Sequence, residues 1–166
     1  MASGPRYKVA FRRRREGRTD YRQRARLLRA RIARAVVRTS SRHTSVQLVQ
    51  YDAQGDRVLA SAHSRELIGL GWNKSTGNLP AAYLTGYLAG MKAKAKGVDE
   101  AVLDIGLKEP VKGAACFAVL KGLLDAGVEV PHGEEVIPSE DRLKGKHIGP
   151  DMEKLIEEVK NKMEVE

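Results

Sequence analysis

The chain of 166 residues has few cysteines and aromatic residues and no long apolar run, which excludes several classes of protein. Its single cysteine, Cys116, allows no intrachain disulfide and no zinc knuckle. Aromatic residues make up only 5% of the sequence, so the core must be built from aliphatic side chains. No apolar run approaches the roughly 18 residues of a membrane span, and the N-terminus lacks the apolar segment of a signal peptide. We therefore expect a soluble, intracellular protein with no membrane contact.

Acidic residues are scarce in the first quarter of the chain. Residues 1–45 contain 15 Lys or Arg and two acidic residues, a net charge of +13, whereas the remainder carries −4. Lys8 is the only lysine among them. The guanidinium of arginine binds phosphate through two parallel hydrogen bonds and stacks on bases. Tyr7, Phe11 and Tyr21 lie among the arginines and offer stacking surfaces for unpaired bases.

This pattern predicts a nucleic-acid-binding segment that prefers RNA to DNA. A solvated charged helix, a transit peptide and a nuclear-localisation patch are the alternatives. The run Arg12–Arg15, followed by a helix-capping residue, argues against a transit peptide. Residues 1–17 show no apolar periodicity, so we expect a basic arm that becomes ordered on a partner. The length fits one further domain, an α/β RNA-binding domain at 18–131, and residues 132–166 form an irregular extension with a C-terminal helix.

A helix is predicted to begin after Asp20, which is a good N-cap residue. Its apolar face extends to Val36 at helical spacing. The residues on that face are Tyr21, Ala25, Leu28, Ile32, Ala35 and Val36. Arginines flank this face on both sides, so the helix could dock on the domain while its flanks contact phosphates. A polar loop, Thr39–His43, is expected to follow.

The middle of the chain predicts a mixed sheet of about five strands. Residues 45–51 and 57–64 alternate around a turn signal and indicate a hairpin, and residues 66–70 form a possible third strand. Two later apolar runs, at 101–107 and 128–130, are separated by a predicted helix at 114–126. This strand–helix–strand order predicts parallel pairing through right-handed crossovers.

Two more helices are expected. Asn78 should cap one that begins near Pro80 and ends before Gly97. Ala82, Gly86 and Gly90 share one of its faces, and we expect this face to pack on the sheet. Residues 151–165 form the amphipathic C-terminal helix, whose apolar face is formed by Met152, Leu155, Ile156, Val159 and Met163. Cys116 is interpreted as a small buried hydrophobic residue.

The loop at 69–78, GLGWNKSTGN, resembles a phosphate-binding P-loop, but two glycines of that motif are absent. An RNA backbone contact next to a helix N-terminus and an ordinary surface loop are equally compatible with this sequence. The four histidines have no metal-ligand spacing, and we expect no metal and no cofactor. Asp52 and Asp104 could hold a metal as nuclease carboxylates do, but purely structural roles are favoured.

Four segments together resemble a known family. They are FRRRREGRTDY at 11–21, RTSSRH at 38–43, NLPAAYLTG at 78–86, and LDIGL with GLLDAGVEVPHGEE further on. They resemble the archaeal and eukaryotic type of the universal large-subunit ribosomal protein number eighteen, over residues 5–150. The resemblance implies a mixed sheet of ribonuclease-H-like topology without enzymatic activity, in a cytoplasmic ribosomal protein.

The resemblance also implies partners and contact residues. The expected function is to bind 5S rRNA and help attach it to the central protuberance. Neighbouring 23S rRNA, large-subunit protein number five and other central-protuberance proteins are the expected partners. The alternative is an RNA-processing nuclease on the same sheet topology. The residues predicted to contact RNA are Tyr7, Phe11, Arg12, Arg13, Arg14, Arg15, Arg18, Tyr21, Arg22, Arg24, Arg26, Arg29, Ser41, Arg42, His43, Lys74, Ser75, Thr76 and Asn78.

Overall fold

The computed structural model describes residues 4–165 and places a mixed four-stranded sheet at the centre of the chain. The strands are β1 (Ala33–Thr39), β2 (Thr44–Gln50), β3 (Arg57–His63) and β4 (Ala101–Asp104), in the spatial order β3-β2-β1-β4. β2 pairs antiparallel with both β1 and β3, and β1 pairs parallel with β4. The predicted hairpin and the mixed character of the sheet are therefore confirmed, but the strand that pairs parallel with β4 is β1, a segment predicted to be helical.

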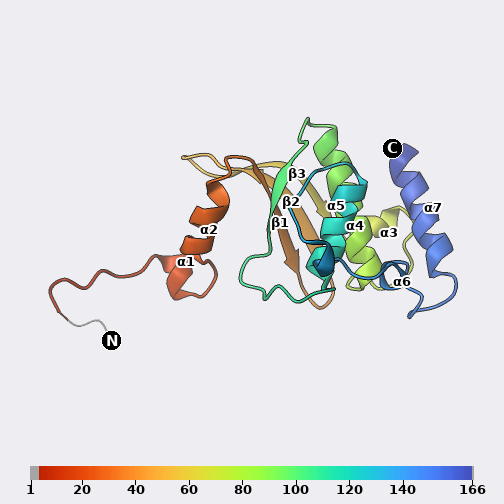
Figure 1. Cartoon of the computed structure of the whole chain (residues 1–166), viewed down its shortest axis with the longest axis horizontal. Helices are drawn as coiled ribbons and strands as arrows, with labels where there is room; N and C mark the ends of the chain where they lie inside the picture. Colours follow the sequence, from red (N-terminus) through yellow and green to blue (C-terminus); the bar gives the residue numbers. More distant parts are fainter. Residues whose placement is uncertain (1–3, 166) are drawn as a thin grey trace.

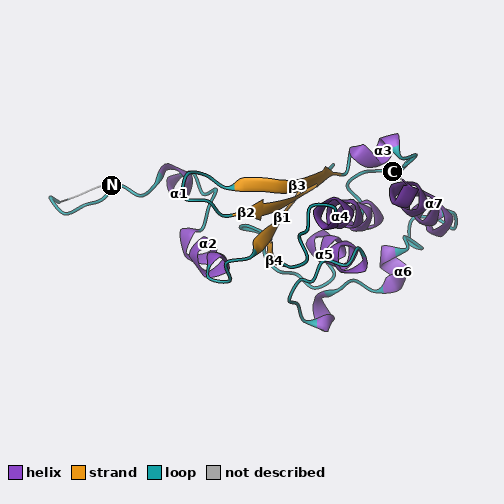
Figure 2. Cartoon of the chain, turned by 90° about the horizontal axis from the view of Figure 1, so that it is seen from above, coloured by secondary structure: helices purple, strands orange, loops and turns teal. Residues whose placement is uncertain are grey.

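Three layers follow one another from the N-terminal side of the molecule (Figures 1 and 2). Helices α1 (Arg12–Arg15) and α2 (Tyr21–Leu28) lie on one side of the sheet. Helices α4 (Leu79–Lys94) and α5 (Ala115–Asp125) cover its other face. Helix α7 (Met152–Val165) packs on α4 at the far end, and the short elements are α3 (Glu66–Gly69), η1 (Glu134–Val136) and α6 (Glu140–Leu143). No helix within residues 4–165 has the length and apolar character needed to cross a membrane.

The core lies between the sheet and the pair α4–α5. Alternate side chains of the strands point into it, and Ala35, Val37, Val46 and Leu48 are almost fully buried. Cys116 is buried on α5, as predicted, and burial raises the pKa of its thiol. The caps are also as predicted: the Asp20 carboxylate accepts hydrogen bonds from the amides of Arg22 and Gln23.

The region predicted to continue the first helix to Val36 instead contains the central strand of the sheet, so this prediction was wrong. Helix α2 ends at Leu28, and Arg31 adopts a left-handed φ of 57° that breaks the helical path. β1 then pairs with β2 on one side and β4 on the other. The β-branched residues Val36 and Val37 suit a strand. Pairing on both edges outweighs the high helix propensity of the arginines and alanines, because tertiary contacts override intrinsic propensity.

Three further expectations are corrected. Residues 66–69 form helix α3 and not a strand. Residues 128–130 contribute only a single parallel bridge, between Glu100 and Glu129, so the sheet has four strands and not about five. The strand predicted at 101–107 ends at Asp104. Residues 1–3 of the predicted arm and residue 166 lie outside the described residues.

The glycines of α4 pack against α5 and not against the sheet, which corrects another prediction. A Cβ atom at Gly86 would lie 2.3 Å from the carbonyl oxygen of Val119, and one at Gly90 would lie 2.5 Å from Cβ of Ala126. Gly122 on α5 matches them, because its Cβ would lie 2.2 Å from the carbonyl oxygen of Tyr83. The two helices thus approach each other at backbone contact.

Replacing Gly86 with alanine is expected to destabilise the protein by about 1–3 kcal/mol or more, because the clash is with backbone that cannot rotate away. The gain in helix propensity, about 1 kcal/mol, is smaller than this cost. Urea unfolding would measure the loss. Gly133→Ala is the matched control, since no atom lies within 4 Å of the added Cβ and the change should stay within about 0.5 kcal/mol. Equal effects of the two substitutions would contradict the close packing.

Candidate nucleic-acid interface

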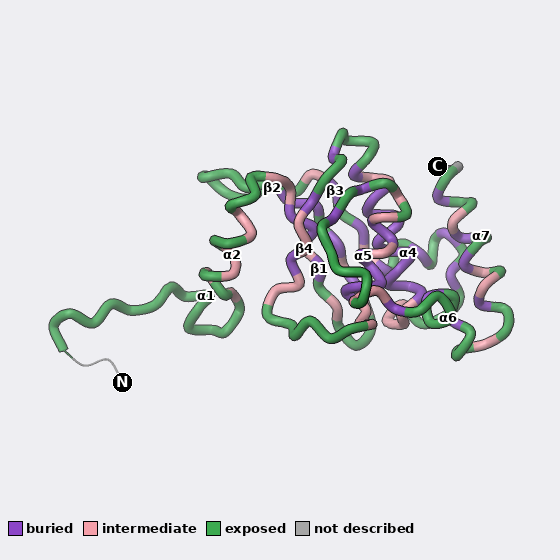
Figure 3. Tube along the Cα trace, in the orientation of Figure 1, coloured by how far each residue is buried: buried purple, intermediate pink, exposed green. Residues whose placement is uncertain are grey.

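The predicted RNA-binding residues fall into two groups. The first belongs to the arm and helices α1 and α2, which stand away from the body and bury no side chain (Figure 3). The second lies in the loops at 41–43 and 74–78, at the opposite end of β1. The sequence alone could not place the two groups relative to each other, because β1 was expected to be helical.

The arm is exposed along its whole described length, residues 4–18. Tyr7 and Phe11 are both more than half exposed, and the Phe11 ring lies 5.2 Å from the ring of Tyr21. Arg13 donates from Nε to the hydroxyl of Thr19 at 2.9 Å, and Arg18 pairs with Glu16 at 3.2 Å. These contacts are local and exposed, so they restrain the arginines weakly and leave the guanidinium groups accessible to a polyanion.

Helix α2 presents its arginines in two ways. Arg22, Arg26 and Arg29 are exposed. Arg24 donates to Asp56 at 2.8 Å and so connects α2 to the turn between β2 and β3. This bond holds the pKa of the Asp56 carboxyl below its usual range. Arg24 therefore stabilises the position of the helix, whereas its three neighbours remain free for other partners.

The second group is built from two loops that contact each other. Thr76 donates a hydrogen bond to the carbonyl oxygen of Arg42 at 2.7 Å, and its hydroxyl lies 3.0 Å from Nδ1 of His43. Gly77 permits this contact, because a Cβ there would lie 2.5 Å from the carbonyl oxygen of Ser41. The structure thus brings together two loops that the sequence predicted separately, and it leaves Arg42 exposed beside them.

The rest of the second loop divides into structural and exposed groups. Asn78 accepts a hydrogen bond from the amide of Ala81 at 2.9 Å and caps α4, as predicted. The carbonyl oxygen of Ser75 accepts a hydrogen bond from the indole of the buried Trp72 at 3.1 Å. Lys74 is exposed. The Asn78 cap and the hydrogen bond from Trp72 fix the backbone of the loop, so that Lys74 projects from a fixed position.

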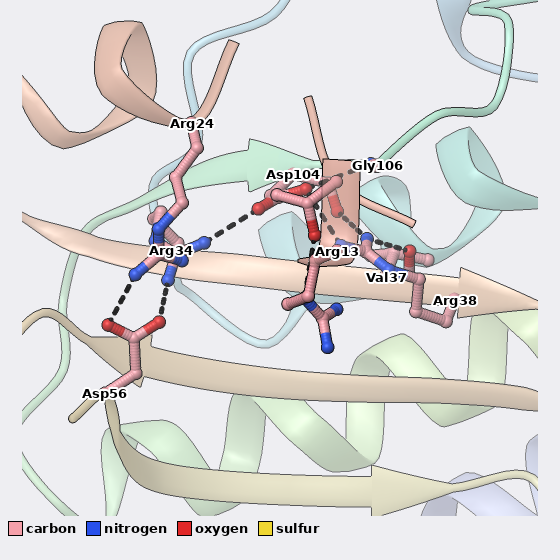
Figure 4. Close-up of polar contacts among 9 residues, drawn as sticks. Arg13, Arg24, Arg34, Val37, Arg38, Asp56, Asp104 and Gly106 are labelled. Atoms are coloured by element: carbon pink, nitrogen blue, oxygen red, sulfur yellow. Dashed lines mark hydrogen bonds and ion pairs between the residues drawn. The ribbon is translucent and has the colours of Figure 1, made fainter. Parts of the chain in front are cut away.

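An ion-pair network that the sequence reasoning missed lies on the open face of the sheet (Figure 4). Arg34 on β1 is only 3% exposed, and its guanidinium donates to Asp104 at 2.8 Å and to Asp56 at 2.6 Å. Arg38, four residues further along β1, donates to the other oxygen of Asp104 at 3.2 Å. The alternation Arg34–Val36–Arg38 was the available signal for a strand, and it was interpreted as a helix face.

The network argues against the nuclease alternative. The carboxylate of Asp104 accepts from two arginines and from the amide of Gly106, so its charge is neutralised by protein groups. Asp52 accepts from the amide of Gln54 within the hairpin turn. Within residues 4–165, no group of three or more His, Cys, Asp or Glu side chains could hold a metal ion. Both aspartates have structural roles.

Comparison with known proteins decides the family. The family model described as "Ribosomal large subunit proteins 60S L5, and 50S L18" matches residues 5–100 and 91–133. The chain belongs to this family. It is 56% identical over 161 residues to the large ribosomal subunit protein uL18 of Methanoregula boonei, covering 97% of this chain and 92% of the relative.

Two other relatives agree. The large ribosomal subunit protein uL18 of Methanothermobacter thermautotrophicus is 52% identical over 158 residues, 95% of this chain and 82% of the relative. The same protein of Methanococcoides burtonii is 56% identical over 153 residues, 92% of this chain and 88% of the relative. Membership in a family of large-subunit ribosomal proteins makes the chain a structural protein of the cytoplasmic ribosome and not an enzyme. The resemblance noted from the sequence is thereby confirmed.

Proposed function

We propose that the chain binds 5S rRNA and helps to attach it to the central protuberance of the large subunit. The observation that carries this proposal is the charge and exposure of the N-terminal segment. Residues 1–45 carry a net charge of +13, and every described residue up to Arg18 is exposed. Such a dense block of like charge is stabilised when a polyanion neutralises it. The partners proposed with it are 23S rRNA, large-subunit protein number five and other central-protuberance proteins.

The proposed contacts follow the two groups of residues. The arm, with Arg12–Arg15 and Arg18, would neutralise phosphates, while Tyr7 and Phe11 offer faces on which unpaired bases stack. Arg22, Arg26 and Arg29 extend this surface along α2. Ser41–His43 and Lys74–Thr76 form a second contact at the other end of β1. RNA that contacts both groups would span the length of β1, which favours a folded RNA over an unstructured strand.

The strand pairing of the sheet supports the expectation that the fold has ribonuclease-H-like topology. A hairpin next to a parallel strand pair, with helices α4 and α5 packed on one face, is compatible with the ribonuclease-H-like topology that the resemblance implied. That topology stays a proposal here. It carries no activity in this chain, because Asp104 is paired with two arginines.

Deletion of residues 1–17 is expected to leave the body folded and to weaken 5S rRNA binding at least tenfold, because several phosphate contacts are lost together. Circular dichroism and thermal unfolding should be nearly unchanged, since the arm buries no side chain. Binding to a size-matched control RNA should weaken as well, and the ratio of the two affinities should fall. If the full chain does not prefer 5S rRNA to the control RNA, the proposal is wrong. Loss of cooperative unfolding in the truncated chain would instead place the arm in the core.

A further inference from the structure

A groove of about 620 Å³ separates helix α2 from the open face of the sheet. This size lies within the range of pockets that bind small ligands. Helix α2 does not fill the groove, because none of its side chains is buried. Arg13 and Arg18 are the groove residues below that also take part in the phosphate contacts proposed above, whereas the residues proposed to bind the base do not. Among the residues that line it are Tyr21, Arg38, Gln47, Tyr51, Val58 and Leu107.

The rim of the groove is apolar and exposed. Tyr51, Val58 and Leu107 come from three separate segments, and each is more than half exposed. Exposed apolar side chains that gather at one concave site, unlike single ones scattered over a surface, mark a place where something binds. Tyr51 is the aromatic member of this set and follows directly on strand β2.

The floor of the groove is polar and fixed. Arg34 and Asp104 are 3% and 6% exposed, and their ion pair holds the floor in one arrangement. Arg38 lies half exposed beside them, with its guanidinium against Gly106, where a Cβ would lie 2.9 Å from Cζ. Gln47 is exposed on the same face and offers both a donor and an acceptor. A purely apolar ligand would cover the amide of Gln47 without giving it a hydrogen-bond partner.

The charge at the groove favours a nucleotide over an acidic peptide. Arg13 and Arg18 also line the groove, and both are exposed where a flanking phosphate would pass. The groove contains four aspartates as well, but Asp56 and Asp104 are each paired with arginines. A planar base needs an aromatic face and hydrogen bonds at its edge, and its backbone needs cations. Tyr51 supplies the aromatic face. Gln47 and Arg38 supply the hydrogen bonds at the edge of the base, and Arg13 and Arg18 supply the cations.

We propose that this groove receives one unpaired nucleotide of the bound RNA, with its base stacked on Tyr51 and its edge toward Gln47 and Arg38. The inference rests on the proposed RNA binding and adds a site to it. Helix α2 is attached to the neighbouring turn through Arg24 and Asp56, so this side of the groove is held in place before the base binds. The contact would read an extruded base and not a duplex, because a paired base exposes no face for stacking.

The test compares three variants of the full chain for binding to 5S rRNA. Tyr51→Ala should bind roughly tenfold more weakly, the loss typical of one base–aromatic stack. Tyr51→Phe keeps the ring and should bind within about twofold of the unchanged protein, since stacking uses the face of the ring. Ile68→Ala is the matched control: its side chain is equally exposed but lies on α3, outside the groove, and it should have no effect.

A second measurement does not depend on the folding of any variant. Ultraviolet crosslinking of the unchanged complex, followed by mass spectrometry, should find a nucleotide adduct on the peptide that contains Tyr51. Equal binding by the alanine variants at 51 and 68, together with no adduct on that peptide, would overturn the inference while leaving the RNA-binding proposal intact. Failure of the unchanged chain to prefer 5S rRNA over a size-matched control RNA would instead overturn the proposed function itself.

Discussion

The affinity of the chain for 5S rRNA is expected to fall by about a thousandfold or more between about 50 and 200 mM salt. With roughly six or more phosphates neutralised, log K should fall with log[salt] at about −0.7 to −0.9 per contact, because each contact releases a condensed counterion. The 15 basic residues in the first 45 provide enough cations for this number of contacts. A titration of binding against salt concentration would give the slope.

Two substitutions on helix α2 test whether the salt dependence comes from exposed arginines that contact phosphate. Arg22→Gln should reduce the magnitude of the slope by about 1, because an exposed phosphate contact is lost. Arg24→Gln should reduce it much less, since the guanidinium of Arg24 is already paired with Asp56. A slope near −1 for the unchanged chain would mean that the basic segment is solvated in the complex. The arm would then have no part in RNA binding.

Replacing Asp104 with alanine is expected to destabilise the fold by roughly 3 kcal/mol, the lower end of the typical cost of breaking a buried ion pair, because Arg34 keeps Asp56 as a second partner. The carboxylate accepts from Arg34 at 2.8 Å, from Arg38 at 3.2 Å and from the amide of Gly106 at 2.9 Å. Arg34 is 3% exposed and cannot turn to water. Urea unfolding at neutral pH, with no RNA present, would measure the loss.

A surface ion pair provides the matched control. Asp99 pairs with Lys94 at 2.8 Å, but the side chain of Asp99 is 76% exposed, so Asp99→Ala should cost no more than about 1 kcal/mol. Removing both charges of the buried pair, in Arg34→Met with Asp104→Leu, should recover much of the loss, because no unpaired charge stays in the interior. Similar small losses for Asp104→Ala and Asp99→Ala would show that the buried network contributes little to stability.

Much of the fold was predictable, because its signals are local. The hairpin was predicted from alternating side chains around a turn, and β2 and β3 lie within one residue of the predicted limits. Asn78 and Pro80 located the start of α4, and the spacing of Met152, Ile156, Val159 and Met163 predicted the face of α7 that is buried. Each of these signals depends on residues only a few positions apart.

The wrong predictions have one cause in common. In each case the structure depends on contacts with a segment that is distant in the sequence. Residues 32–36 fit a helix by spacing, but both of their edges find strands to pair with. Gly86 and Gly90 predicted a close approach correctly, yet only the fold determines that the neighbour is α5. Residues 128–130 have the composition of a strand, but they reach the sheet at one bridge.

The sequence by itself determined where the charge lies, which residues could stack on bases, and which family the motifs resemble. It also predicted an RNA contact at each of the two loops of the second group. Only the tertiary structure decided that Arg34, Asp56 and Asp104 form one network, and that α2 faces the open side of the sheet across a groove. The physical reason is that composition and spacing describe the neighbours of a residue along the chain. Pairing across a sheet joins residues as far apart as 34 and 104, and no local pattern encodes that contact.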